Sequence, residues 1–251
     1  TATSLDISGD IDVDGTTNLD VVDIDGAVNF AADVTFADGA DIITASAGTS
    51  NFRAGVNAGN SIASGGNYNT VVGDEAGTAI TTGDANVAIG FRTLDANTTG
   101  ANNTAVGLAA LGANTSAANN TALGYSALTA NTTGASNIAI GVEALDANTA
   151  GNRTIAIGQA AFGALNHTSS TNNYGVAIGH EAGRLVTTGL KNTFIGGQSG
   201  YDLTTGGQNV AVGYGALYEA TTSSNNTAVG YLALLANTTG ASNTAVGSFA
   251  G

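Results

Sequence analysis

The apolar positions of this chain recur with a fixed long period. Between residues 73 and 247, eleven short apolar runs each end in a glycine, and nine of the ten steps between these glycines are 17 residues long. The anchor glycines are Gly73, Gly90, Gly107, Gly124, Gly141, Gly158, Gly179, Gly196, Gly213, Gly230 and Gly247. Such a period is typical of stacked repeats that bury their apolar faces on one another. We therefore predict an all-β fold, a parallel β-solenoid or β-roll of about eleven 17-residue repeats, roughly 50 Å long at ~4.8 Å per coil.

Each repeat predicts a short strand with two unlike faces. Residues two apart share a face, so the aliphatic residue before each glycine lies beside the residue two earlier, as Ile140 does with Ile138. We expect this aliphatic face to point into the coil. The opposite face carries the anchor glycine and, in nine of eleven repeats, an alanine: Ala88, Ala105, Ala122, Ala139, Ala156, Ala177, Ala211, Ala228 and Ala245. Because so small a stripe lets a backbone approach closely, we predict that it contacts another layer or another chain around a three-fold axis.

Polar residues also recur in register. Asparagine begins nine of the strands, at Asn69, Asn86, Asn103, Asn120, Asn137, Asn192, Asn209, Asn226 and Asn243. Stacked one coil apart, these amides are expected to form a hydrogen-bonded ladder. Thr-Thr-Gly triplets such as 98–100 predict the corners, where glycine would supply a positive φ. The one longer step, of 21 residues, places four extra residues within 167–175, which we expect to protrude as a loop without disturbing the register.

The chain divides into three segments. Residues 1–48 alternate apolar and polar positions and hold ten of the nineteen acidic residues, which predicts an acidic N-terminal β-strand module. Residues 49–68 are expected to be a transition segment, and residues 69–251 form the solenoid. Asp10, Asp12 and Asp14 match the first half of an EF-hand loop, but Val21 stands where the closing glutamate is needed, so we predict no metal site.

Charge and chemistry narrow the functional classes. A net charge of −14 opposes binding to nucleic acid or to an anionic membrane, and no apolar run is long enough for membrane insertion. Cysteine is absent, no carboxylate pair recurs, and His167 and His180 lie in or just after the insertion, where we expect surface loops. His180 and Glu181 should point apart, as neighbours on a strand do. We predict that the chain is not an enzyme, with no catalytic residue and no cofactor.

The most variable repeat position follows the anchor glycine. It holds Phe91, Tyr125, Tyr214 and Tyr231, which are candidates for stacking on the sugar rings of a cell-surface glycan or for packing over neighbouring coils. Nine N-x-Ser/Thr sequons arise largely from the repeat itself and leave glycosylation open. Adjacent threonines at a corner cannot share one flat strand face, which disfavours an ice-binding surface.

Two strand motifs carry a resemblance to known families. Residues 86–90 and 137–141, Asn-Val-Ala-Ile-Gly and Asn-Ile-Ala-Ile-Gly, resemble the repeats of trimeric autotransporter adhesin heads of the YadA type. The longer repeat from Asn102, and again from Asn225, is similar to repeats in marine bacteriophage tail-fibre proteins. The resemblance implies a homotrimeric β-roll. The period and the Ala-Leu pair depart from the adhesin pattern.

These observations favour a non-enzymatic structural or adhesive fibre segment, a phage tail fibre or a cell-surface adhesin head. It would be extracellular, on a virion or a cell surface, and would display a receptor-binding surface. The alternative is a subunit of an extracellular filament that polymerises end to end. A polysaccharide depolymerase is a third class, which would need a carboxylate cluster in a groove.

Overall fold

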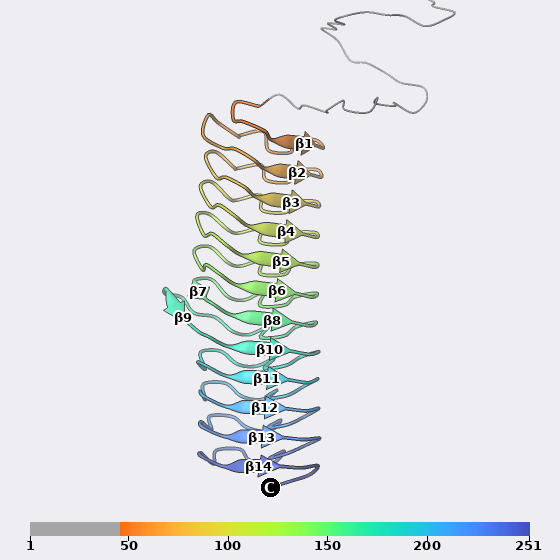
Figure 1. The fold of residues 1–251 in the computed structure, drawn as a ribbon, viewed down its shortest axis with the longest axis vertical. Coiled ribbons are helices and arrows are strands. Elements are labelled where there is room, and N and C mark those ends of the chain that lie inside the picture. The colour runs from red at the N-terminus through yellow and green to blue at the C-terminus, as the bar shows by residue number, and fades with distance from the viewer. Residues whose placement is uncertain (1–45) are drawn as a thin grey trace, which may run out of the picture. The chain divides into compact units, whose positions relative to one another are not determined.

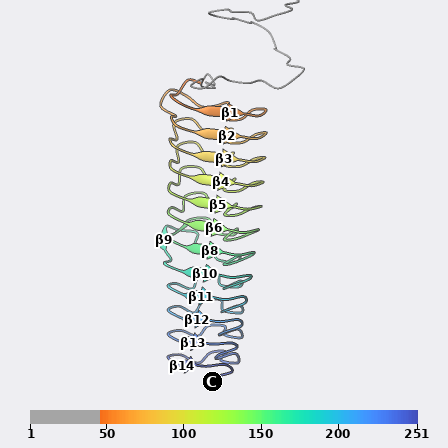
Figure 2. The same ribbon diagram turned by 45° about the vertical axis from the view of Figure 1, so that its right-hand side comes forward.

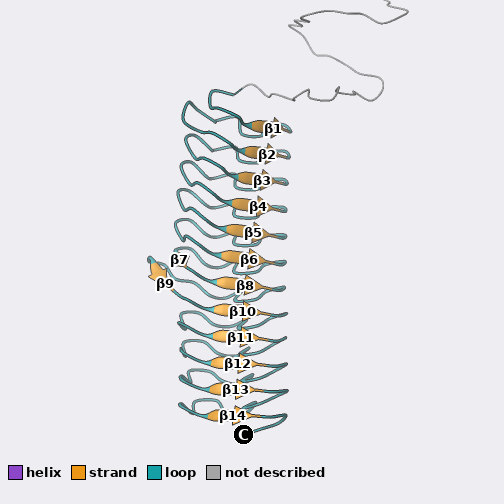
Figure 3. Ribbon diagram, in the orientation of Figure 1, coloured by secondary structure: helices purple, strands orange, loops and turns teal. Residues whose placement is uncertain are grey.

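A computed structural model of the protein describes residues 46–251. Asp10, Asp12 and Asp14, with the rest of the acidic segment up to residue 45, lie outside the described residues. Within residues 46–251 the chain winds into a stack of similar turns, each with one short strand and connecting loops, and no helix is present in this part of the chain (Figure 3).

All the described strands except β7 and β9 form one parallel sheet along the side of the stack (Figure 1 and Figure 2). Its twelve strands, in spatial order, are β1 (Phe52–Ala54), β2 (Thr70–Val72), β3 (Val87–Ile89), β4 (Thr104–Val106), β5 (Thr121–Leu123), β6 (Ile138–Ile140), β8 (Ile155–Ile157), β10 (Val176–Ile178), β11 (Thr193–Ile195), β12 (Val210–Val212), β13 (Thr227–Val229) and β14 (Thr244–Val246). Nine of the eleven pairings join residues 17 apart, as Val87 with Thr104. The predicted parallel β-solenoid of about eleven turns is confirmed.

The solenoid begins earlier than the sequence pattern indicates. Strand β1 lies inside the segment that was expected to be a transition, and Phe52 pairs with Thr70, 18 residues later. The backbone of Phe52 also donates a hydrogen bond to the Asn69 carbonyl at 2.8 Å, as strand-starting residues do in later turns.

The insertion leaves the register intact, as predicted. Strands β8 and β10 pair directly, with Ile155 opposite Val176, and the extra residues form a separate two-stranded sheet of β7 (Gly151–Asn152) and β9 (Thr171–Asn172). Residues 168–170 are exposed, but His167 and Asn173 at either side of them are buried. The extra residues thus lie in a protruding loop, as expected, and the residues at its base are buried. The Asn173 side chain fills the space beside Gly175, which stands where other strands start with asparagine.

The interior of the coil is lined by the alanines and not by the aliphatic face. In the main sheet from β2 to β14, the middle residue of each strand points inward and is buried, as Ala88, Ala105 and Ala139 are, whereas the flanking residues such as Val87 and Ile89 point outward. The expected direction of the two faces is thus wrong, and so is the expected chain-to-chain contact of the alanine stripe. The stripe is a contact between layers, because each alanine stands in register with the middle residue of the next turn.

The small alanines face inward because the coil must also hold a second buried row of side chains, which comes from the turn after each strand. This row consists of Leu94, Leu111, Leu128, Leu145, Phe162, Leu217 and Leu234, four residues after the anchor glycines. Their φ values lie between 48° and 57°, a left-handed conformation that costs a residue with a side chain about 1–2 kcal/mol. Packing in the core has to offset that strain.

Four turns fill the same space in another way. They have glycine at this position and an aliphatic residue three positions later: Gly59 with Ile62, Gly77 with Ile80, Gly183 with Val186, and Gly200 with Leu203. The Cδ1 atom of Ile80 lies 2.8 Å from the place where a Cβ on Gly77 would be. In the leucine turns at Leu94, Leu111, Leu128 and Leu145, the later position is a buried asparagine. Most turns therefore use one of two arrangements, glycine with a later aliphatic residue or leucine with a later asparagine, whereas Phe162 with Leu165 and Leu217 with Ala220 fit neither.

The predicted asparagine ladder is confirmed. The backbone N–H and the Nδ2 of Asn86 both donate to Oδ1 of Asn69, at 3.0 and 3.1 Å, and Asn103 bonds to Asn86 in the same way. Each Nδ2 also donates to a carbonyl of the next turn, as Asn86 does to Gly100 at 2.9 Å. These amides are buried and hydrogen-bonded, which is the condition under which buried polar groups stabilise a core.

Glycine serves two different purposes in each turn. The anchor glycines have φ values from +124° to +137°, a region that only glycine adopts without strain. The glycines of the Thr-Thr-Gly corners, such as Gly83, are not in that region, so the expected positive φ is wrong there. A Cβ on Gly83 would collide with the carbonyl oxygen of Gly100 in the next turn. Corner glycines are thus explained by the close approach of successive turns.

Candidate binding surfaces

The outward side chains of the sheet form a continuous apolar surface, here called the sheet face. One row is aliphatic in every turn from β2 to β14: Val72, Ile89, Val106, Leu123, Ile140, Ile157, Ile178, Ile195, Val212, Val229 and Val246. The other row mixes threonine with valine and isoleucine in no regular order, from Thr70 to Thr244. Ile89, Leu123 and Ile195 are 38%, 46% and 40% exposed. An exposed apolar patch that is this long and flat is uncommon on a monomer and marks an interaction surface.

The predicted aromatic candidates are exposed but fall into two groups. Phe91, Leu108, Tyr125 and Val142 follow one another in consecutive turns, and each is 42% to 49% exposed. Gln159, His180 and Gly197 then interrupt the row before Tyr214 and Tyr231. The structure therefore brings Tyr214 and Tyr231 together and separates them from Phe91 and Tyr125.

The tyrosines also pack on their neighbours. The rings of Tyr214 and Tyr231 are stacked with centroids 5.8 Å apart, and the hydroxyl of Tyr214 donates to Oε1 of Gln198 at 2.8 Å. A second stacked pair, Tyr201 with Tyr218 at 5.0 Å, lies five residues after its anchor glycines. Sequence reasoning missed this pair, although its 17-residue spacing was visible.

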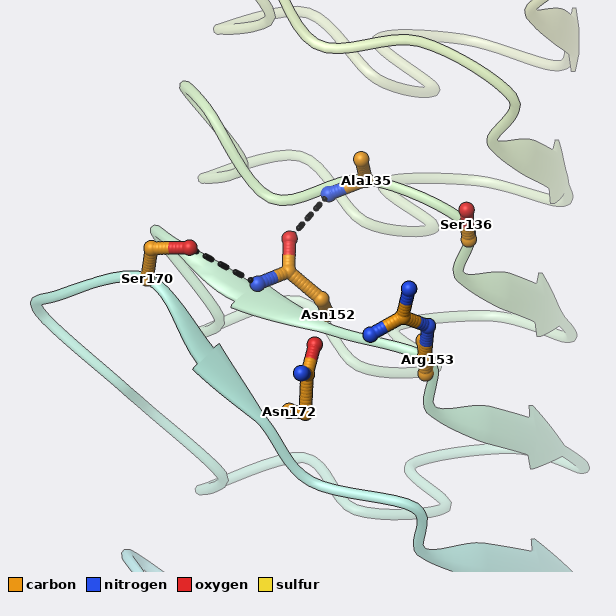
Figure 4. A pocket seen from close by; sticks show the side chains of 6 residues that line it. All are labelled: Ala135, Ser136, Asn152, Arg153, Ser170 and Asn172. Atoms are coloured by element: carbon orange, nitrogen blue, oxygen red, sulfur yellow. Dashed lines mark hydrogen bonds between the residues drawn. The ribbon is translucent and has the colours of Figure 1, made fainter.

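A polar pocket opens beside the insertion (Figure 4). It has a volume of about 230 Å³ and is lined by Ala135, Ser136, Asn152, Arg153, Ser170 and Asn172, which come from the turn before β6, from β7 and from the insertion around β9. The side chain of Asn152 fixes one wall, because its Oδ1 accepts from the Ala135 N–H at 2.7 Å and its Nδ2 donates to Oγ of Ser170 at 3.1 Å. Arg153 lies beside Tyr174, with its Cζ 5.8 Å from the ring centroid.

The two histidines occupy different surroundings. His167 is 7% exposed, and its Nε2 lies 3.1 Å from Nδ2 of Asn173, so the expected surface position is wrong for this residue. Burial lowers the pKa of His167, which keeps the ring neutral and able to accept that hydrogen bond. His180 is exposed, as expected, but its Nδ1 lies 3.6 Å from Oε2 of Glu181. The two side chains meet because they belong to the turn after β10 and not to a strand.

Other chemical features are limited to what residues 46–251 show. No group of three or more His, Cys, Asp or Glu side chains in this part of the chain is placed to hold a metal ion, and no helix there is long and apolar enough to cross a membrane. The sequon residues Asn97, Asn114 and Asn131 are buried in a second amide ladder, whereas Asn102, Asn119 and Asn225 are exposed. A folded chain therefore offers only some of its sequons to a glycosylating enzyme.

No family model matches the chain, and neither a curated protein nor a solved structure matches it.

Proposed function

We propose that this chain is a non-enzymatic fibre segment that associates with copies of itself, as a homotrimer, through the sheet face. In this role it would be a tail-fibre or adhesin segment outside the cell, on a virion or a cell surface. The β-solenoid fold is compatible with a structural fibre or adhesin segment. The observation that carries the proposal is the aliphatic row that points outward in every turn from β2 to β14, with five of its eleven side chains exposed and the other six half-buried. Interfaces of lasting assemblies bury such surfaces away from water.

The sheet face replaces the alanine stripe as the assembly surface. The alanines are already buried within one chain, whereas the outward aliphatic residues remain available to a second chain. Flat sheets pack face to face at ~10 Å, which suits a long straight contact between identical shafts. A row repeated in register also allows each chain to present the same surface to its neighbour, as closed symmetric assemblies require.

The test is the mass of the protein in solution. We expect the wild-type chain of 24.3 kDa to run at three times that mass in light scattering. Leu123→Lys or Ile195→Lys, which place charges in the interface, should yield folded monomers. Ser116→Lys, which adds the same charge at an exposed corner, should leave the trimer intact. A wild-type protein that stays monomeric at high concentration contradicts the proposal. Open filaments that are indifferent to Leu123→Lys would support end-to-end polymerisation instead.

Binding to a receptor is the second part of the proposed role. The exposed aromatic residues Phe91, Tyr125, Tyr214 and Tyr231 offer ring faces that suit the apolar face of a sugar. A glycan array should register binding that Tyr231→Ala reduces and Tyr231→Phe keeps, because the ring face and not the hydroxyl makes the contact. Turnover of a polysaccharide by the purified protein would contradict the non-enzymatic role.

A further inference from the structure

The pocket beside the insertion breaks the repetition of the surface. In regular turns each loop lies directly on the next, and a carbonyl of the next turn closes the space at the corner, as Gly100 does above Gly83. In the turn after β8 the chain instead leaves the stack at residues 168–170 and returns along β9, which pairs with β7 and lies outside the main row of strands in Figure 1. The space between β9 and the turn of Ala135 and Ser136 becomes the pocket.

The lining is polar with one positive charge. Among the six residues that line the pocket there are two amides, two hydroxyls and the guanidinium of Arg153, and no carboxylate. The ion pairs found within residues 46–251 join Arg92 to Glu75 and His180 to Glu181, so Arg153 forms none in this part of the chain. An arginine left without a carboxylate, in a chain with a net charge of −14, creates a local preference for an anion.

The position of Arg153 is maintained by the fold. Its backbone has a φ of 57°, and its N–H donates to the carbonyl of Ala135 at 3.1 Å. On the other side, Nη1 lies 3.5 Å from the Tyr174 hydroxyl, and the guanidinium sits over the tyrosine ring. Ser136, Arg153 and Tyr174 occupy the same repeat position in three successive turns, so a hydroxyl, a cation and an exposed aromatic ring stand in one row.

We propose that this pocket binds an acidic sugar. Arg153 holds the single anionic group, a carboxylate or a sulfate, with its two-pronged hydrogen-bonding edge. The amide of Asn172 and the hydroxyls of Ser136 and Ser170 bind sugar hydroxyls. The exposed ring of Tyr174, which lies beside Arg153 and outside the pocket lining, contacts the apolar face of the sugar. A volume below the ~300–1,000 Å³ of sites for drug-sized ligands suits one sugar unit at the end of a chain. The proposal rests on the role of the fibre in receptor display.

The chemistry separates this ligand from other anions. A phosphate group carries up to two charges and is commonly held by several N–H donors at a helix N-terminus or by more than one cation, whereas this pocket has one guanidinium. Nucleic acid, with its row of phosphates, is opposed by the net charge of −14. A sugar with one anionic group and several hydroxyls matches both the single cation and the surrounding amides and hydroxyls.

Isothermal titration of the full chain with three probes tests the proposal. The probes are an oligogalacturonate, its neutral methyl ester and a sulfated galactan. We expect the wild-type protein to bind at least one of the two anionic probes and to bind the ester at least tenfold more weakly. Arg153→Ala should lose roughly tenfold in affinity, which corresponds to ~1.4 kcal/mol. Arg153→Lys should recover only part of that loss, because an ammonium lacks the planar fork.

Lys191→Ala is the matched control. Lys191 occupies the same repeat position two turns after Arg153 and carries the same charge, but it does not line the pocket. Equal losses in Lys191→Ala and Arg153→Ala would overturn the site, since they would indicate attraction by overall charge. Binding of neither anionic probe, or equal binding of the ester, would also overturn it. The mass of Arg153→Ala in solution should stay that of wild type, so that a failure here leaves the proposed fibre assembly standing.

Discussion

The two kinds of turn predict that Leu94 and Asn97 can be exchanged together for glycine and isoleucine. Leu94 is fully buried at a φ of 54°, and its turn lies directly after the turn with Gly77 and Ile80. The double change Leu94→Gly with Asn97→Ile would repeat the Gly77 and Ile80 arrangement one turn further. The isoleucine Cδ1 would then occupy the space that the leucine leaves.

The single changes have opposing contributions. Leu94→Ala keeps the left-handed strain and opens a cavity, which we expect to cost about 2–5 kcal/mol of the free energy of unfolding. Leu94→Gly opens a similar cavity but relieves about 1–2 kcal/mol of strain, so at this site glycine should be less damaging than alanine. Asn97→Ile alone crowds Leu94 and should cost about 1–3 kcal/mol.

The hydrogen bonds of Asn97 limit the cost of replacing it. Asn97 donates to the Gly100 carbonyl at 3.0 Å and accepts from Nδ2 of Asn114 at 2.8 Å. After the change, Asn86 still donates to Gly100, and Asn114 still donates to the Ala117 carbonyl. Neither remaining group is left without a partner. The double variant should therefore be more stable than the sum of the single effects by on the order of 2 kcal/mol, which is in the range for residues in contact.

Urea unfolding of the four variants measures this coupling. Circular dichroism and tyrosine fluorescence should give the same midpoint, because an array of repeats can lose cooperativity and the free energies would then have no clear meaning. Additive effects within about 0.5 kcal/mol, or an alanine variant more stable than the glycine variant, would refute the exchange of the two packing solutions.

Two further outcomes follow from the buried positions. Ala139→Leu should lower the free energy of unfolding by about 1–3 kcal/mol through overpacking, while the folded protein keeps the mass of the wild type in solution. A variant that stays stable but no longer assembles would show instead that the alanine stripe is an interface between chains. Burial lowers the pKa of His167 below the ~6.5 of the unfolded chain. The contribution of neutral His167 to the free energy of unfolding is therefore complete above about pH 6.5 and is lost as the pH falls below that value. At about pH 5.5, the amides of residues 167–173 should exchange faster than the pH dependence of unprotected amides accounts for. We expect this in the wild-type protein and in His180→Gln, but not in His167→Gln.

The period, the register and the amide ladder could be predicted from the sequence, because each of them follows from the spacing of residues alone. A 17-residue step sets Val87 beside Thr104, and asparagines one step apart must stack. Which strand face points inward does not follow from spacing. Alternation shows that Ile138 and Ile140 share a face, but the choice depends on the width of the coil and on the leucine that enters from the following turn.

One pair of residues indicates, from the sequence alone, which strand face points into the core. Phe194 takes the middle strand position that is alanine in nine repeats, and Gly200 follows six residues later where most turns have leucine. A Cβ on Gly200 would lie 2.6 Å from the Cε1 atom of Phe194. Such a large-for-small exchange is expected between neighbours in one core and has no reason to occur on an outward stripe. Phe162, buried two turns earlier, packs edge-on against Phe194 with the ring centroids 5.9 Å apart.

The pocket could not be read from the sequence, because it depends on the return path of the insertion. Ser136, Asn152 and Asn172 are far from consecutive, and only the pairing of β7 with β9 brings the third of them beside the other two. The 21-residue step indicated where regularity ends but not which side chains gather there. In a regular array, a residue that serves stacking recurs in most turns, as the strand-starting asparagines do. Arg153 and Asn172 are not repeated through the array in this way, so the uniform core does not explain them, and this is the physical reason to look for ligand recognition at the insertion.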